Sequence, residues 1–289
     1  MSQPVVDVLL PLALGFIMFA LGLTLTVGDF ARLVARPRAM AVGLAGQVLL
    51  VPLVGFAVAT VTGLPPAMAA GLMIVAACPG GASSGLITHL ARGDTALSIS
   101  LTAVTSVASV VTLPFVLDLA LRHFVGSGVG ALPVGRMVRG VFFLATVPVA
   151  AGMLLKHWRP ALAARIAGTT ERIATALFLL IVLATFASQR ETLAANIGAV
   201  GPAALLHNVA VMALGAGLAA ASGLRPRDRV AIAVECGLHN AAVGIFIAAT
   251  VLGMPALAVP SVVYALLMNG TAICLIVFMR RREAACATG

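Results

Sequence analysis

Long apolar segments separated by short polar stretches fill nearly the whole chain. A bilayer core of about 30 Å requires about 20 apolar residues per helix. No polar stretch is long enough to form a domain outside the membrane. The pattern therefore predicts an all-α membrane protein with nine transmembrane helices. With glycines, prolines and charge clusters as boundaries, the segments are 5–27, 37–62, 66–91, 95–121, 136–155, 173–188, 197–222, 229–252 and 256–279.

Composition strengthens this prediction. The chain is 61% hydrophobic and only 9% charged, whereas a soluble domain is about half apolar and about a quarter charged. Intrinsic disorder requires the opposite balance of low hydrophobicity and high charge. The net charge of +9 would also suit a nucleic-acid partner, but the basic residues lie in short loops between apolar spans. That placement is typical of membrane proteins, so we expect the lipid bilayer and no nucleic acid as partner.

The distribution of basic residues predicts an orientation. Lys and Arg accumulate in short cytoplasmic loops, and placing the N-terminus outside puts 14 of the 18 basic residues on the inner side. The outer loops then contain the other four basic residues, among them Arg136. The last basic residue on the inner side is Arg282. We therefore expect an N-terminus outside and a C-terminus in the cytoplasm. The first segment lacks a basic region before it and a cleavage site, so we expect it to be retained.

Two of the predicted spans are interrupted. Segment 66–91 contains Cys78-Pro79-Gly80-Gly81, where the proline removes a hydrogen-bond donor and disfavours helix at the preceding residue. Segment 229–252 contains Glu235, His239 and Asn240 at membrane depth. Ionisable groups are rare there because they are costly to insert, and they usually mark a functional site.

The interrupted spans occupy equivalent places in two sets of helices. Segments one to four and six to nine align as two sets of opposite orientation, and the interrupted segment is third in each. This pattern in two inverted halves points to a transport site near the bilayer midplane. We therefore expect a single transmembrane transporter domain over 1–289, with a four-helix first repeat at 5–121 and a five-helix second repeat at 136–279.

Oxygen-bearing side chains are the candidate chemistry. Glu235 is the one acidic residue placed near mid-membrane, and a neutral, hydrogen-bonded carboxyl is the structural alternative. Gln47 and Asn269 each lie mid-span, where an interhelical hydrogen bond is the simpler interpretation. Hydroxyls at spacings of three and four form a polar stripe that suits either helix packing or a hard cation. The stripe consists of Ser98, Thr102, Thr105, Ser106, Ser109 and Thr112.

Several enzyme motifs are missing from the sequence. It contains no GxxxxGK[ST] phosphate-binding loop, no HExxH pair and no GxSxG elbow. These absences argue against an ATP-driven pump and against the common hydrolases. We therefore expect a protein that is not an enzyme, with no catalytic residue and no organic cofactor.

At Cys78–Thr102 and Glu235–Asn240 the sequence resembles the bile acid:sodium symporter family. The segments Cys78-Pro-Gly-Gly and Leu90-Ala-Arg-Gly-Asp-Thr-Ala-Leu-Ser98 carry most of the resemblance. Bacterial members have ten helices in two inverted repeats, divided into a core and a panel domain, with two crossing broken helices. The resemblance thus implies an inverted-repeat transporter without the first helix, spanning a bacterial inner membrane several times.

The resemblance also implies a set of site residues. The family binds two sodium ions, which serve as coupling ions, and a small organic anion such as a bile acid, pantoate or a keto acid. A first sodium site would use Ser84, Ser98, Thr102 and Glu235. A second would use Gln47, Glu235, His239 and backbone oxygens near Cys236 and Leu238. Asn240 and Asn269 would face the substrate.

Two departures from the family pattern bear on the coupling ion. Gly85 replaces an asparagine, and His239 replaces a glutamine whose amide oxygen would bind sodium. A neutral imidazole nitrogen is a poor sodium ligand, whereas a histidine near a buried glutamate suits proton coupling. The sequence therefore predicts a sodium-coupled importer of an organic anion, with proton coupling through Glu235 and His239 as the alternative. A channel or an intramembrane enzyme is a more remote alternative for the function.

Overall fold

The computed structural model describes residues 3–81, 83–126 and 134–287, and every regular element in these ranges is helical. The side chains of Arg136 and Arg282, which belong to the charge count, lie outside the described part. In chain order the elements are α1 (Gln3–Thr24), α2 (Val27–Ala35), α3 (Pro37–Ala45), η1 (Gly46–Leu50), α4 (Val51–Val61), α5 (Pro66–Ala77), α6 (Ser84–Leu90), α7 (Thr95–Phe124), α8 (Val134–Val141), η2 (Phe142–Thr146), α9 (Val147–Trp158), α10 (Pro160–Ser188), α11 (Arg190–Ala221), α12 (Pro226–Gly237), α13 (Ala241–Phe246), η3 (Ile247–Val251), η4 (Pro255–Ala258) and α14 (Val259–Ala287).

The helices are those of a multi-pass membrane protein. Within the described residues, six are long and apolar enough to cross a bilayer. Three shorter apolar helices, at Leu9–Thr24, Pro66–Ala77 and Ala241–Val251, accompany them. The total of nine spans stays a prediction. The six long helices are Pro37–Val61, Thr95–Phe124, Met137–Trp158, Pro160–Ser188, Arg190–Ala221 and Pro255–Arg281.

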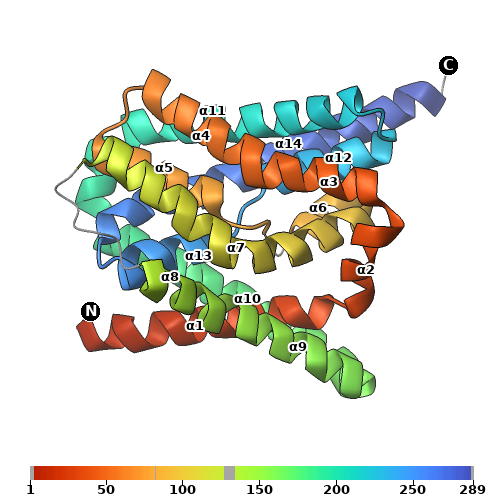
Figure 1. The fold of residues 1–289 in the computed structure, drawn as a ribbon, viewed down its shortest axis with the longest axis horizontal. Coiled ribbons are helices and arrows are strands. Elements are labelled where there is room, and N and C mark those ends of the chain that lie inside the picture. The colour runs from red at the N-terminus through yellow and green to blue at the C-terminus, as the bar shows by residue number, and fades with distance from the viewer. Residues whose placement is uncertain (1–2, 82, 127–133, 288–289) are drawn as a thin grey trace.

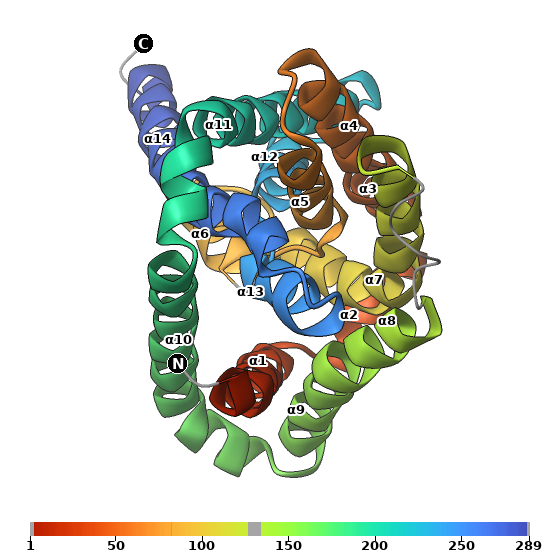
Figure 2. The same ribbon diagram turned by 90° about the vertical axis from the view of Figure 1, so that its left-hand side faces the viewer.

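Both predicted interruptions are confirmed. The helix α5 ends at Ala77, and Cys78 is extended with φ −68° and ψ 148°, as expected for a residue before proline. In the second interrupted segment, α12 ends at Gly237 and Leu238 is extended with φ −106° and ψ 104°. Figure 2 shows α5, α12 and α13 in the interior, surrounded by the other helices.

A short helix was not predicted, and one predicted boundary was wrong. The first span, expected over roughly 5–27, ends as α1 at Thr24, and a separate helix α2 follows it. Asp29 stabilises the start of α2, because its carboxylate accepts hydrogen bonds from the Thr26 backbone and hydroxyl, both at 2.8 Å. The expected segment 173–188 is only the second half of α10. Hydropathy marks the apolar part of a helix, whereas a charged extension can continue the same helix into water.

Helices α1, α9 and α10 lie together along one side of the molecule (Figures 1 and 2). Glycines bring α1 and α9 into close contact: a Cβ atom built on Gly22 would meet the Val149 carbonyl oxygen, and one on Gly152 would meet the Phe19 carbonyl oxygen. Small residues permit such close backbone approach between membrane helices. The contact between α1 and α9 therefore depends on the absence of side chains at Gly22 and Gly152. Trp158, at the end of α9, is 70% exposed.

Candidate functional site

The two helix breaks lie against each other and are joined through the backbone. The Gly81 N–H donates to the Leu238 carbonyl at 2.8 Å, and the Asn240 N–H donates to the Pro79 carbonyl at 2.9 Å. Gly80 and His239 form the resulting antiparallel bridge. Backbone groups at membrane depth must find partners within the protein, and here each break supplies partners for the other.

Beside this junction, a carboxylate and three hydroxyls form one hydrogen-bonded cluster. Thr102 donates to Glu235 Oε1 at 2.7 Å, and Ser98 donates to Glu235 Oε2 at 3.1 Å. Ser84 Oγ lies 3.0 Å from Thr102 Oγ1, and it accepts from Ser98 Oγ at 3.4 Å. All four side chains are at most 2% exposed. The structure thus brings together the four residues expected at the first cation site, from α6, α7 and α12.

Gly80 leaves the space that the carboxylate occupies. A Cβ atom built at position 80 would collide with Glu235 Oε1 and would lie 3.1 Å from Thr102 Oγ1. From the sequence, Gly80 was identified only as part of the interrupted segment after Cys78. Its steric role depends on how the two interrupted segments cross, which the sequence does not state.

A second polar group lies on the other side of the first break. Gln47 Nε2 donates to the Cys78 carbonyl at 3.1 Å and lies 3.2 Å from His239 Nδ1. An amide nitrogen only donates, so Nδ1 accepts and a neutral imidazole carries its proton on Nε2. His239 Nε2 and Gln47 Oε1 are buried and without a hydrogen-bond partner in the described structure. Gln47 and His239, two residues of the expected second site, thus contact each other.

The remaining expected site residues have other surroundings. The Leu238 carbonyl already accepts from Gly81, and the Cys236 side chain packs near Gly46 and Gly215. Asn240 caps α13 by accepting from the Val243 N–H at 3.3 Å, and its amide nitrogen lies 3.7 Å from Met18 Sδ on α1. Asn269 donates to the Ala265 carbonyl of its own helix at 2.6 Å. Substrate contact by Asn240 and Asn269 stays a prediction.

A buried polar group around Gly237 was missed by sequence reasoning. Asn208 Nδ2 donates to the Gly237 carbonyl at 2.7 Å, and the Tyr264 hydroxyl donates to the same oxygen at 2.9 Å. His207 and His239 stack with ring centroids 6.2 Å apart. Asn208 and Tyr264 thus hold the end of α12 from α11 and α14. The signal for this was the position of the chain's single tyrosine within an apolar segment.

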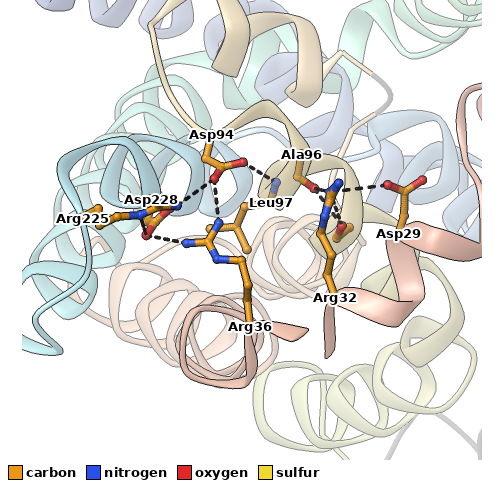
Figure 3. A network of polar contacts seen from close by, with 9 residues as sticks. Asp29, Arg32, Arg36, Asp94, Ala96, Leu97, Arg225 and Asp228 are labelled. Atoms are coloured by element: carbon orange, nitrogen blue, oxygen red, sulfur yellow. Dashed lines mark hydrogen bonds and ion pairs between the residues drawn. The ribbon is translucent and has the colours of Figure 1, made fainter. Parts of the chain in front are cut away.

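Charged residues within or directly before α2, α3, α7 and α12 form a network of ion pairs and hydrogen bonds (Figure 3). Arg36 pairs with Asp94 at 2.7 Å and with Asp228 at 2.8 Å, and Arg225 pairs with the same two carboxylates at 3.1 and 3.0 Å. Burial raises the pKa of Asp228, but hydrogen bonds from Arg225 and Arg36, and their charge, outweigh it and hold that pKa below its usual range. Arg32 extends the contacts to α7 by donating to the Ala96 carbonyl at 2.9 Å.

The Glu235 cluster offers what a small hard cation requires. Hard cations prefer oxygen ligands, and the cluster supplies a carboxylate and three hydroxyl oxygens away from water. In the described part of the structure the Glu235 carboxylate accepts hydrogen bonds from the hydroxyls of Ser98 and Thr102, so a cation there would neutralise its negative charge.

Comparisons with known proteins agree with this chemistry. The model of the sodium bile acid symporter family matches residues 11–196. A rice protein named probable sodium/metabolite cotransporter BASS2, chloroplastic, is 33% identical over 95% of this chain and 64% of its own length. The sodium-dependent transporter YocS of Bacillus subtilis is 31% identical over 89% of this chain and 78% of its own. The rabbit ileal sodium/bile acid cotransporter is 29% identical over 54% of this chain and 45% of its own.

Proposed function

Because the chain belongs to the sodium bile acid symporter family, we propose that it is a sodium-coupled symporter that imports a small organic anion by alternating access. The Glu235 cluster carries this proposal, since it offers a buried carboxylate and hydroxyls from three helices to one cation. A cation that joins α6, α7 and α12 would stabilise one arrangement of these helices. Transport would follow because the substrate would favour the arrangement in which the cation is bound.

We assign the other residues as follows. Ser84, Ser98 and Thr102 complete the first sodium site around Glu235, and Gln47 and His239 border the second. Asn240 and Asn269 face the substrate. This substrate is a small organic anion such as a bile acid, pantoate or a keto acid. The rice relative extends beyond the match, since this chain spans 64% of its length.

The proposed topology has nine spans, with the N-terminus outside and the C-terminus in the cytoplasm. In this arrangement residues 5–121 and 136–279 are inverted repeats whose third helices are broken after Ala77 and after Gly237. The charged residues around Asp94 and Asp228 would then lie on the cytoplasmic side, as the positive-inside rule requires of their arginines.

Thermal melting of the purified protein tests the coupling ion without a substrate. We expect NaCl to raise the melting temperature over KCl and choline chloride at pH 5.5, 7 and 8.5. A ligand that binds only the folded state stabilises it by about 2.7 kcal/mol at a hundredfold excess over Kd. Glu235→Ala should remove the sodium effect while the protein stays folded. Glu171→Ala is the matched control, because Glu171 is exposed on α10 and distant in sequence from the cluster.

The opposite results point to different mechanisms. A sodium effect that persists in Glu235→Ala would contradict the assignment of Glu235. The absence of any sodium effect, with a pH-dependent melt that changes in His239→Gln, would favour proton coupling. Anion flux without accumulation against a gradient would indicate a channel.

A further inference from the structure

Helix α10 lies on the periphery of the molecule, with α1 on its inner side (Figure 2). One face of α10 is buried and contains Ala163, Thr170, Ala174 and Ile181. An α-helix turns by about 100° per residue, so positions 165, 172, 179 and 183 share the opposite face. The residues of this outward face, Arg165, Arg172, Leu179 and Leu183, are all exposed.

The outward face changes from apolar to basic along the helix. Leu179 is 54% exposed and Leu183 is 65% exposed. Arg172 precedes Leu179 by seven residues, and Arg165 precedes Arg172 by seven more, so each interval is about 10.5 Å along the axis. Leu183 lies about 16.5 Å from Arg172 along the axis, close to the ~15 Å of hydrocarbon in one leaflet. The two leucines can therefore contact acyl chains while Arg172 lies at the level of the headgroups.

The two arginines of the outward face are unpaired. Within the part of the chain that the structure describes, neither side chain has a hydrogen bond or an ion pair. The acidic residue nearest in sequence is Glu171, which lies about 100° around the helix from Arg172. The positive charge of Arg165 and Arg172 is therefore available to an anion outside the protein.

The chemistry of this face selects the kind of anion. A guanidinium group binds phosphate through two parallel hydrogen bonds. A phosphate midway between Arg165 and Arg172 would lie about 5 Å along the axis from each Cα atom, within reach of both side chains. A free phosphate would contact only the arginines, whereas the phosphate of a phospholipid is tied to acyl chains that also cover Leu179 and Leu183. A zwitterionic headgroup would bring its own cation next to the two arginines, so a net negative headgroup suits them better.

We propose that the outward face of α10 is a binding site for one anionic phospholipid. Arg165 and Arg172 bind its phosphate, and its acyl chains lie along Leu179 and Leu183. The bound lipid fixes the depth of α10 in the bilayer beside α1. This site does not rest on the proposed function, because none of the residues assigned above to sodium or to the substrate contributes to it.

Native mass spectrometry of the delipidated protein in detergent tests this site. The protein is titrated with dioleoyl phosphatidylglycerol, which is anionic, and with dioleoyl phosphatidylcholine, which is zwitterionic and has the same acyl chains. We expect Kd for the first bound phosphatidylglycerol to be at least tenfold lower than for phosphatidylcholine. In Arg165→Gln/Arg172→Gln the difference should shrink to less than threefold.

The matched control is Arg38→Gln/Arg227→Gln. It removes two exposed positive charges as well, but these lie in the first turns of α3 and α12 and not on α10. The control should keep the tenfold preference. An equal loss of preference in the control would overturn the site, because the effect would then follow from net charge alone. Equal Kd values for the two lipids in the unsubstituted protein, or a tenfold preference that persists in Arg165→Gln/Arg172→Gln, would overturn it as well.

Two further measurements complete the test. If the double variant does not fold, Arg172→Gln alone should reduce the preference at least threefold, and an unchanged preference would overturn the site. Glycerol phosphate, added to the unsubstituted protein at the concentration of the lipid, should leave phosphatidylglycerol bound, because it lacks the acyl chains. Displacement of the lipid by glycerol phosphate would identify a site for free phosphate esters and would contradict the proposal.

Discussion

Single atoms decide whether the Glu235 cluster can form. We predict that Gly80→Ala abolishes the stabilisation by NaCl, because the added methyl would occupy the place of Glu235 Oε1. Thermal melting with and without NaCl measures this effect. Gly85→Ala is the comparison, because its methyl meets Ile99 Cγ1 at 3.0 Å, and a side chain can shift. A normal sodium response in Gly80→Ala would show that the carboxylate does not need this position.

At the residue scale, the chemistry of the site could be predicted better than its contacts. Ser84, Ser98, Thr102 and Glu235 were identified from residue type and from family resemblance, and the structure places them together. The collision that forbids a side chain at Gly80 could not be predicted, because it arises where two segments far apart in sequence cross. Such contacts depend on the relative placement of helices and leave no local pattern.

At the scale of elements, two donors hold the end of α12 through the Gly237 carbonyl. Tyr264→Phe should lower the free energy of unfolding by about 1–3 kcal/mol, since the hydroxyl's bonds to the Gly237 carbonyl and from Asn208 are both lost, while Asn208 still donates to that carbonyl. Adding Asn208→Leu should cost about 1–3 kcal/mol beyond the sum of the single effects, because the buried carbonyl then has no donor. Denaturant unfolding in detergent of the single and double variants measures the difference. Additive effects would contradict a shared role at Gly237.

The charged residues around Asp228 give a prediction with a defined pH dependence. Asp228→Asn should lower the free energy of unfolding by up to about 3 kcal/mol, near the lower end for breaking a buried ion pair, because Asp228 is 1% exposed and Arg36 only 30%. Arg225→Gln should have a much smaller effect, since Arg225 is 64% exposed.

The sign of the pH effect follows from the lowered pKa of Asp228. A carboxyl whose folded pKa is below its unfolded value of about 3.9 stabilises the fold above that value and loses this effect as pH falls through the folded pKa. The difference in melting temperature between the unsubstituted protein and Asp228→Asn should therefore be constant from pH 5 to 8 and shrink below about pH 4. A difference that changes between pH 6 and 8 would contradict this account.

The elements themselves could be predicted where the sequence contains a local cause. Pro79 removes a backbone donor, so the break after α5 could be expected, and the ionisable side chains of Glu235 and His239 marked the second break without a proline. The helix α2 was missed because it is short and its start depends on the hydrogen bonds between Thr26 and Asp29. The first half of α10 was missed because its polar side chains carry no hydropathy signal.

At the scale of the whole molecule, the contact between α1 and α9 requires glycine. Gly152→Ala should lower the free energy of unfolding by about 1–3 kcal/mol, the usual effect of overpacking, because the methyl would meet the Phe19 carbonyl and Leu23 N of α1. Gly168→Ala on α10 is the control, since a Cβ atom there meets nothing within 4 Å. Equal melting temperatures for the two variants would show that α1 and α9 can separate without loss.

The position of Trp158 has a consequence for spectroscopy. It is the only tryptophan of the chain, it is 70% exposed, and it lies at the end of α9, whereas the Glu235 cluster is formed by α6, α7 and α12. Its fluorescence emission therefore originates from one place on the helices beside α1. A change in this emission when NaCl is added would therefore report that cation binding at the Glu235 cluster moves the distant helix α9, without the need for an attached dye.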